Sequence, residues 1–287
     1  MKLKSALISI GLALCCLVTS GCSSKSSPGN IGKEVAFKDG DLIADIEIEN
    51  YGTIKAKLFP DIAPNAVENF VKLSKNGYYD GLKIHRVAKD MCIQGGSLNG
   101  DGTGGTALIN TDGFFDNELS LDARNFYGAL CYANQNGKNT TQFYIVNCKT
   151  PQDITQFDAQ KILEKAAEYT ALKEGMDATD PDYDFITAQE AYYTELANML
   201  SKASEEVKTR YAEDGGYPLW DGMSTVFGQV YEGFDVLEKI SAVEVTTNQL
   251  GKQERPKVDI IINSVKIIEY VTPEPVEESS SSSKKKK

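Results

Sequence analysis

The sequence predicts a mainly β protein, a closed β-barrel rather than a sandwich, with a pair of helices set into it. Three features of its 287 residues support this fold class. Many short stretches alternate apolar and polar side chains, as half-buried strands do. Two isolated stretches have helical spacing and would cap the barrel. Between Cys148 and Trp220 the apolar period changes to the longer period of helices.

The strands and capping helices are expected in a definite order along the chain. The first two strands lie on either side of Asn50-Tyr51-Gly52, a sequence typical of a hairpin turn. Pro64 favours the first turn of the helix that follows, and Gly77 favours its end. The remaining expected elements are strands at 82–87, 127–134, 142–147, 224–230 and 257–270 and a helix at 234–243.

The segment 152–216 is expected to be an inserted antiparallel helical pair. Residues 158–175 carry apolar side chains along one stripe. Residues 187–190, Thr-Ala-Gln-Glu, match a capping box and predict the start of the second helix. Gly215 and Gly216 predict its end. The apolar stripes favour packing of the two helices on each other over a ligand groove.

Residues 1–21 predict a signal peptide, because two lysines precede an apolar run too short to span a membrane comfortably. The segment resembles a bacterial lipobox that ends at Cys22, except that Thr19 stands where Leu is usual. Acylation of Cys22, with palmitate for example, would hold the protein on the outer side of the bacterial cell membrane through a tether at 22–40. An ordinary secretory signal is the alternative. The low-complexity tail 272–287 is expected to be disordered.

The composition excludes several classes of function. A formal net charge of −11 disfavours binding to nucleic acid. Cys92, Cys131 and Cys148 remain once the signal and the lipid site are set aside. Their odd number argues against a disulfide framework, and their apolar surroundings predict buried free thiols. One histidine and no CxxC sequence leave no convincing zinc or redox site, so no metal and no cofactor are expected.

The stretch 78–105 combines apolar strand residues with groups that bind polar ligands. It holds the single histidine, His85, beside Arg86, and Gln94 follows eight positions after the arginine. The chain has no GxSxG elbow, no paired carboxylates in an apolar setting, and no lysine in the glycine-rich loop at 101–105. The remaining set, a permanently charged arginine with amide side chains and apolar residues, suits binding of a peptide carbonyl without covalent catalysis.

The run 84–96, IHRVAKDMCIQGG, resembles the signature of the cyclophilin-type peptidyl-prolyl cis–trans isomerases. Further segments occur in the family's order: DGTGG at 101–105, AN at 133–134, QFYI at 142–145, LWDG at 219–222 and VFGQV at 226–230. The resemblance implies a closed eight-stranded antiparallel barrel over 41–271, interrupted by the helical insertion at 152–216. It also implies prolyl isomerase activity (EC 5.2.1.8) without a cofactor.

The resemblance assigns catalysis to Arg86 and Gln94. Arg86 would bond the carbonyl before proline and polarise toward the prolyl nitrogen, and Gln94 would bond the peptide backbone. Asn134 would clamp the peptide through main-chain groups, and His85 would support its strand rather than donate a proton. The whole substrate-binding set that the resemblance implies is His85, Met91, Cys92, Gly102, Thr103, Ala133, Asn134, Gln142, Tyr144, Leu219 and Trp220.

The expected cup for the proline ring departs from the family pattern. Met91, Cys92, Tyr144 and Leu219 would form it, with Trp220 beside Leu219 or exchanged with it by a shift of one residue. The family usually has Phe where Met91 and Tyr144 stand, so the cup would be less aromatic than usual.

Two functions from different classes follow. The first is a monomeric, lipid-anchored isomerase and folding chaperone that acts on proline-containing peptides and unfolded exported proteins. The alternative is a weakly catalytic or non-catalytic cyclophilin-fold module that binds clients through the helical insertion. A purely structural surface lipoprotein would have no affinity for X–Pro peptides.

Overall fold

A computed structural model of the protein describes residues 35–273. The expectations for the signal peptide, for Cys22, for the tether up to residue 34 and for the tail beyond residue 273 lie outside this range. No helix within 35–273 has both the length and the apolar character that a membrane span requires.

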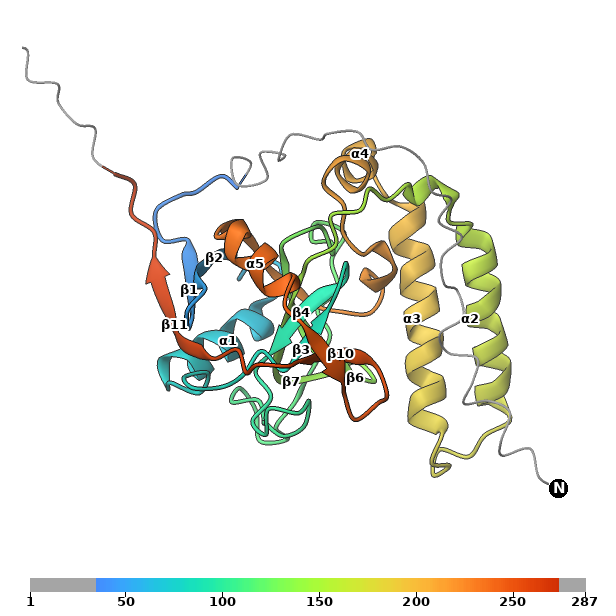
Figure 1. Cartoon of the computed structure of the whole chain (residues 1–287). Coiled ribbons are helices and arrows are strands. Elements are labelled where there is room, and N and C mark those ends of the chain that lie inside the picture. Colours follow the sequence, from blue (N-terminus) through green and yellow to red (C-terminus); the bar gives the residue numbers. More distant parts are fainter. Residues whose placement is uncertain (1–34, 274–287) are drawn as a thin grey trace, which may run out of the picture.

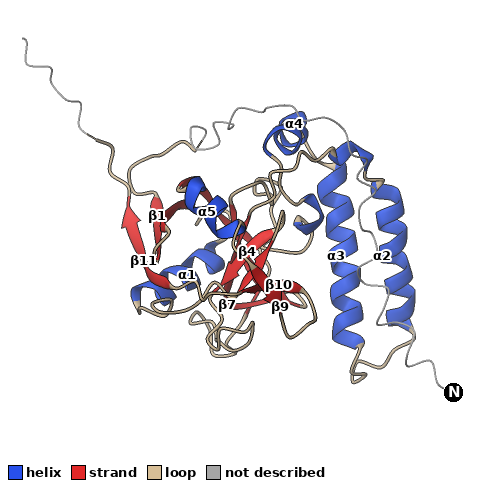
Figure 2. Cartoon of the chain, in the orientation of Figure 1, coloured by secondary structure: helices blue, strands red, loops and turns tan. Residues whose placement is uncertain are grey.

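One antiparallel sheet of nine strands organises the chain (Figures 1 and 2). Its strands follow the order β11-β1-β2-β8-β6-β7-β4-β3, and β5 pairs with β7 beside this path. A separate hairpin joins β9 and β10. The strands are β1 Leu42–Ile48, β2 Gly52–Leu58, β3 Arg86–Ala88, β4 Cys92–Gly95, β5 Phe115–Asp116, β6 Ala129–Gln135, β7 Lys138–Val146, β8 Val226–Glu232, β9 Val245–Thr247, β10 Gln253–Pro256 and β11 Ile262–Glu269.

The sheet is curled but open, so the expectation of a closed eight-stranded barrel is wrong in that respect. The end strands β3 and β11 do not pair with each other. The segment before β3 meets the start of β11 through a bridge between Lys83 and Ile261 and a hydrogen bond of 2.8 Å from the Ile262 N–H to the Leu82 carbonyl. The Ile84 N–H donates to the Ile260 carbonyl at 2.9 Å beside this bridge. Strand β3 pairs with β4 along all three of its residues, and β11 pairs with β1, so β3 and β11 remain the two ends of the sheet.

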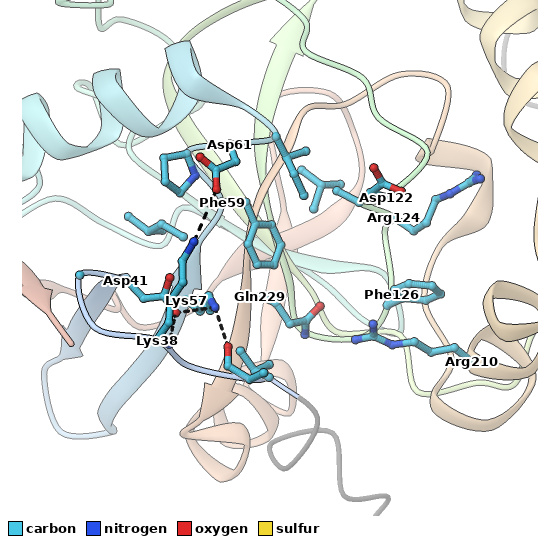
Figure 3. A pocket seen from close by; sticks show the side chains of 18 of the residues that line it. Lys38, Asp41, Lys57, Phe59, Asp61, Asp122, Arg124, Phe126, Arg210 and Gln229 are labelled. Carbon is cyan, nitrogen blue, oxygen red and sulfur yellow. Dashed lines mark hydrogen bonds and ion pairs between the residues drawn. The ribbon is translucent and has the colours of Figure 1, made fainter. Parts of the chain in front are cut away.

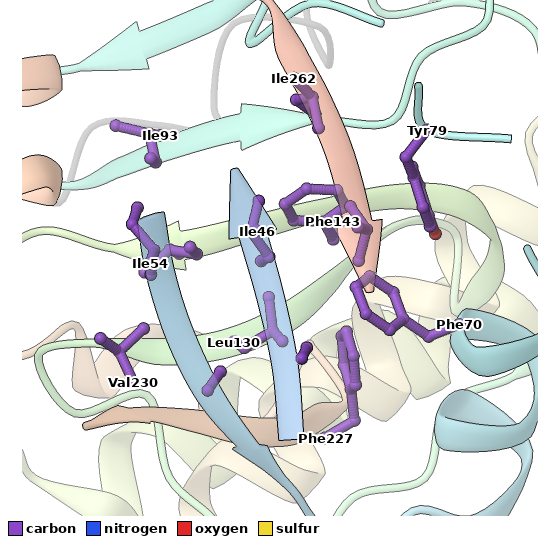
Figure 4. Packing of buried hydrophobic residues seen from close by; sticks show 14 of the residues in the cluster. Ile46, Ile54, Phe70, Tyr79, Ile93, Leu130, Phe143, Phe227, Val230 and Ile262 are labelled. Atoms are coloured by element: carbon purple, nitrogen blue, oxygen red, sulfur yellow. The ribbon is translucent and has the colours of Figure 1, made fainter. Parts of the chain in front are cut away.

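The hydrophobic core fills the inner side of the curled sheet (Figure 4). Strand residues reach it at alternate positions, as Val87, Ile93 and Ile145 do on three neighbouring strands. Helix α1 (Pro64–Lys75) begins at the expected proline and contributes Phe70, whose ring lies 5.7 Å from that of Phe143. The second short helix, α5 (Phe234–Ser241), packs against β2, β3 and β4. Both helices pack on the inner side of the sheet. The outer face of β3, β4 and β7 therefore lies outside this core.

Three helices lie between β7 and β8. Helix α2 (Ala159–Glu174) agrees with expectation, because Asp158 caps its first turn and Gly175 ends it. Helix α3 (Tyr183–Ser201) packs beside α2 (Figure 1). Short 3₁₀ turns at Ile154–Gln156 (η2) and Pro218–Trp220 (η3) precede and follow the helices.

The limits of the second expected helix were wrong. Helix α3 begins after Asp182, so Thr187 lies inside the helix and does not start it. Ile186 is buried one residue earlier, and this packing extends the helix toward its N-terminus. The run also breaks after Ser201, and a separate helix α4 (Glu205–Asp214) begins where the Ser204 hydroxyl accepts from the Val207 N–H at 3.2 Å.

Candidate functional site

Neighbouring strands bring the two expected catalytic residues together on the outer face of the sheet. Arg86 on β3 lies opposite Gln94 on β4, and Gln94 lies opposite Tyr144 on β7. Side chains of paired residues point to the same face of a sheet. The residues between them, such as Val87 and Ile93, point into the core. The alternation of the sequence therefore fixes which side chains form the site.

Arg86 is held by strong acceptors on one side and meets weak ones on the other. Its Nε and Nη2 donate to the two carboxylate oxygens of Glu254, at 2.8 and 3.2 Å. Its Nη1 donates to Oε1 of Gln94 at 3.2 Å. The remaining contacts of the guanidinium are with sulfur atoms, at 3.4 Å to Cys92 Sγ and 3.5 Å to Met91 Sδ. Sulfur is a weak acceptor, so a stronger one can replace it.

A chain of amide groups continues from Arg86 to the glycine-rich loop. Gln94 Nε2 donates to Oε1 of Gln142 at 3.1 Å, and Gln142 Nε2 donates to the Gly102 carbonyl at 2.9 Å. Thr103, next in the loop, donates through its N–H and its hydroxyl to Asp101 Oδ1. Each amide group thus has a defined orientation. Gly102 and Thr103 border the site through this loop.

Apolar and aromatic side chains lie beside Arg86 and form a cup. Tyr144 and Trp220 meet edge to face, with ring centres 5.0 Å apart. Met91, Cys92 and Ala133 belong to the same cluster. Tyr217 also belongs to it, with its ring centre 4.3 Å from that of Trp220. We use "cup" below for Met91, Cys92, Ala133, Tyr144, Tyr217 and Trp220.

Leu219 is not part of this cup. Its side chain packs with Tyr192 of α3 and with other residues of the helical segment. The Tyr192 hydroxyl also donates to the Leu219 carbonyl at 3.1 Å. Trp220 occupies the expected position of Leu219, which is the one-residue exchange considered from the sequence. Helix α3 holds Leu219 because its apolar face needs a partner.

Asn134 and Ala133 lie at an irregularity of β6 next to the cup. The register of β6 with β7 shifts between Tyr132 and Asn134, so Ala133 has no partner in the ladder. Such bulges redirect side chains near functional sites. The Asn134 side chain donates to the Met223 carbonyl at 2.8 Å and accepts from the Gly137 N–H at 3.0 Å. The expected main-chain clamp by Asn134 stays a prediction.

His85 and the cysteines are poorly suited to proton transfer or nucleophilic attack. Burial and the neighbouring Arg86 lower the pKa of His85 to about 4, so the imidazole is neutral at pH 7. Burial raises the pKa of Cys92 to about 11, so its thiol is neutral. Cys92, Cys131 and Cys148 are free and buried, which confirms the expectation for these thiols.

Figure 3 shows the lining of a cavity on another part of the molecule. Its volume is about 530 Å3. It is bordered by the first described residues, the end of β2 and α4. Side chains of both charges line it: Lys57 pairs with Asp41 at 2.6 Å, and the Arg210 guanidinium lies 4.1 Å from the ring centre of Phe126. Neither Arg86 nor any cup residue borders it. The size of a cavity is therefore a poor guide here, and the candidate site is an open face defined by its hydrogen-bond donors.

Glu254, Tyr217 and Tyr192 belong to the site or support it, and the sequence did not point to them. Glu254 lies 168 positions after Arg86 and approaches it only through the β9–β10 hairpin. Tyr192 lies in residues 181–206, the internal segment that departs from the family pattern, and Tyr217 lies a few residues beyond it. Clustering of aromatic residues around Trp220 was the one signal that could have indicated Tyr217.

Comparisons with known proteins point to one family. The family model described as "Cyclophilin type peptidyl-prolyl cis-trans isomerase/CLD" matches residues 43–180 and 207–267. A Staphylococcus epidermidis protein named "Putative peptidyl-prolyl cis-trans isomerase" is 36% identical over 227 residues, which cover 77% of this chain and 89% of that protein. A Staphylococcus haemolyticus protein of the same name is 36% identical over 222 residues, covering 76% and 87%.

Solved structures show the same fold. A crystal structure of a Cryptosporidium parvum cyclophilin type peptidyl-prolyl cis-trans isomerase superposes with a TM-score of 0.52 and 21% sequence identity. The match covers 81% of this chain and 99% of that one. A second structure of that protein, in the presence of the dipeptide Ala-Pro, gives a TM-score of 0.51. Together with the family model and the staphylococcal relatives, these likenesses show that the chain belongs to the cyclophilin-type peptidyl-prolyl cis-trans isomerase family.

Proposed function

We propose that this protein isomerises X–Pro bonds of exported proteins by a non-covalent mechanism centred on Arg86. One observation carries the proposal. The guanidinium directs its two weakly bonded N–H groups at the sulfur atoms of Met91 and Cys92, which line the cup. A proline ring seated in the cup would bring its amide to these donors.

The physics of the reaction requires little more than this arrangement. Turning an X–Pro bond means breaking amide resonance, and the barrier is roughly 18–20 kcal/mol. The prolyl nitrogen becomes pyramidal and regains its lone pair in the twisted state, so a cation that donates to it binds that state selectively. No bond is made or cut, so a neutral Cys92 and a neutral His85 are no obstacle. Gln94 and Gln142 would hold the peptide backbone beside the cup.

The ligand class is supported by a relative of the same fold. The Cryptosporidium parvum protein was crystallised in the presence of Ala-Pro, a dipeptide that ends in proline. In this chain, Tyr144 and Trp220 supply the aromatic surface against which a proline ring can pack. The main chain of Asn134 lies beside them for the peptide that continues from the ring.

Exchange of a proline peptide tests the proposal. Cis–trans exchange measured by NMR should be faster with the wild-type protein than without it. Loss of a donor to the transition state typically costs about 10²–10³-fold, and Arg86→Ala should lose a factor of this size. Lys83→Ala, a change to an exposed ion pair with Asp259 on the same segment, is the matched control and should keep its rate. Equal rates for wild type and Arg86→Ala would remove the basis of the proposal.

A second candidate function is client binding through the helices, with little catalysis. Three observations favour it. Residues 181–206, which contain α3, fall outside the family match. Helix α3 bonds the turn that carries Trp220, through Tyr192 and Leu219. The segment between the strands is also far longer than the roughly 2–6 residues of most connections.

Shortening α2 and α3 separates the two candidates. Deletion of the whole segment 152–216 would also remove Tyr192 and α4, so a smaller change is preferable. Replacing residues 170–191 by a short glycine-asparagine turn keeps the stacked pair Tyr169 and Tyr193 and removes the last turn of α2 and the first half of α3. If peptide exchange persists while capture of an unfolded exported protein is lost, the helices recognise clients. If both persist, client binding lies elsewhere.

We also propose that Cys22 is acylated and holds the protein on the outer side of the bacterial membrane. The support is the lipobox-like sequence before Cys22 and the polar stretch after it. Cys22→Ala should release the protein to the medium, and a variant that stays in the membrane fraction would argue against the lipid.

A further inference from the structure

Glu254 reaches the site through an irregularity in its own hairpin. On β10, Gln253 pairs with Thr247 and Arg255 with Thr246, so Glu254 is an extra residue between two consecutive partners. A β-bulge of this kind redirects a side chain. Here the carboxylate turns toward β3, against which β10 packs. The side chain is 13% exposed, which is low for a carboxylate at a hairpin.

The contact with Arg86 is a two-point ion pair. Glu254 Oε2 accepts from Nε at 2.8 Å and Oε1 accepts from Nη2 at 3.2 Å. Paired bonds of this type fix the plane of a guanidinium as well as its position. Asn248, in the loop of the same hairpin, donates to Oε2 at 3.4 Å and supports the carboxylate. The ion pair therefore determines which way the other donors of Arg86 point.

Each of the five N–H groups of Arg86 has an acceptor, and the acceptors differ in strength. Glu254 takes one from Nε and one from Nη2, and Gln94 takes one from Nη1. The second N–H of each terminal nitrogen is left for the sulfurs of Cys92 and Met91. Glu254 thus occupies the edge of the guanidinium away from the cup and leaves the two donors at the cup open to a peptide.

We propose that Glu254 is a positioning residue for catalysis, which acts through Arg86 by holding the guanidinium so that two N–H donors face the cup. The inference rests on the proposed isomerase function. Removal of the carboxylate would also leave the half-buried cation without its partner, and Arg86 would turn toward solvent.

Four variants test the inference with the full chain. Glu254→Ala removes both acceptors, and Glu254→Gln keeps the volume and one acceptor. Glu244→Gln is the matched control, because Glu244 precedes the same hairpin and, among residues 35–273, its carboxylate pairs with exposed Lys257 alone. The double variant Arg86→Ala/Glu254→Ala asks whether Glu254 acts through Arg86. Peptide exchange is measured by NMR with enzyme at peptide concentration, together with melting temperature and the Nε–H signal of Arg86.

The expected kcat/KM of Glu254→Ala is at least tenfold lower, mainly through kcat, with Glu254→Gln between it and wild type. Glu244→Gln should match wild type, and Glu254→Ala should add no further loss to Arg86→Ala. In both Glu254 variants the Arg86 Nε–H signal should exchange faster with water, a readout that does not depend on activity.

Other outcomes overturn the inference. Wild-type activity and an unchanged Nε–H signal in Glu254→Gln would show that the ion pair orients nothing. Faster catalysis in Glu254→Ala would make Glu254 an inhibitor of Arg86. An equal loss in the wild-type and Arg86→Ala backgrounds would mean a purely structural role. If wild type and Arg86→Ala have the same rate, the proposed function itself fails, and that result is distinct from the other three.

Discussion

The hydroxyl of Tyr144, whose ring forms part of the cup, donates a hydrogen bond of 2.7 Å to Oδ1 of Asn125. Asn125 Nδ2 donates in turn to Asp221 Oδ1 at 3.2 Å. The same oxygen accepts from the hydroxyl of Tyr211 at 2.8 Å. All four side chains are buried. A continuous line of hydrogen bonds therefore joins the cup to α4.

The first prediction concerns the far end of this line. Tyr211→Phe removes a hydrogen bond to a buried carboxylate and should lower the free energy of unfolding by about 1.5–3 kcal/mol. Urea denaturation measures the loss. Tyr169→Phe on α2 is the control, because within residues 35–273 its hydroxyl makes no hydrogen bond, and a change within about 0.5 kcal/mol is expected. Similar losses in the two variants would show that Tyr211 stabilises the fold through packing alone.

The second prediction concerns the cation that balances Asp221. Arg124 and Asp221 form a buried ion pair at 3.2 Å, and Arg124 also donates to the Met199 carbonyl of α3. Arg124→Met leaves a buried carboxylate without its cation and should cost about 3–5 kcal/mol. Burial already raises the pKa of Asp221, so the loss should shrink as the pH falls and the carboxyl is protonated.

A surface pair provides the contrast for Arg124. Lys257→Met breaks an exposed pair with Glu244 and should lower the free energy of unfolding far less than Arg124→Met does. Adding Asp221→Asn to Arg124→Met should recover part of the stability, because the unpaired charge disappears. A double variant as unstable as the sum of the two single variants would contradict this explanation.

The third prediction uses the single histidine. Folding lowers the pKa of His85 from 6.5 to about 4, so between these pH values the unfolded chain binds more protons at this residue than the folded one. Stability from His85 is complete above pH 6.5 and is lost as the pH falls to 4, by an amount on the order of 3 kcal/mol. His85→Gln should lack this part of the pH dependence. The one histidine signal in the NMR spectrum should titrate near pH 4, and a midpoint near 6.5 would be the contrary result.

The family resemblance named the site residues that lie on adjacent strands, and strand alternation explains why they share a face. Arg86, Gln94 and Tyr144 face one side because strand residues alternate and the three strands pair in register. The sequence could not predict Glu254, since its approach depends on a hairpin bulge whose position no local signal marks. It also misplaced Leu219, because the choice between Leu219 and Trp220 depends on which residue α3 covers.

The helical segment shows the same division between local and distant causes. Asp158 and Gly175 limit α2 through local backbone chemistry, and both were predicted. The capping-box sequence at Thr187 does not start the helix, because α3 begins at Tyr183 and buries Ile186 in its first turn. Closure of the sheet could not be predicted from local sequence either. It depends on whether β3 and β11, the two ends of the sheet, come opposite each other after the sheet curls.

The fourth prediction concerns the contact between α3 and the turn that carries Trp220. Gly222 lies so close to α3 that a Cβ atom would come within 2.4 Å of the Leu196 nitrogen and 2.7 Å of its Cα. Both are main-chain atoms of a helix, so the clash cannot be relieved by rotating a side chain. Gly222→Ala should therefore push α3 away from the turn, at a cost of about 1–3 kcal/mol.

Displacement of α3 by Gly222→Ala should also change the position of Trp220 in the cup. The Tyr192 bond to the Leu219 carbonyl would lengthen and release the turn on which Trp220 lies. Trp220 is the only tryptophan, so its fluorescence reports on the cup alone, and the emission of Gly222→Ala should shift to longer wavelength as the ring becomes more exposed. Gly175→Ala, where a Cβ would meet only the Leu172 carbonyl at 3.7 Å, should keep wild-type emission and stability. Unchanged fluorescence in Gly222→Ala, with stability lost, would mean that α3 supports the fold without shaping the cup.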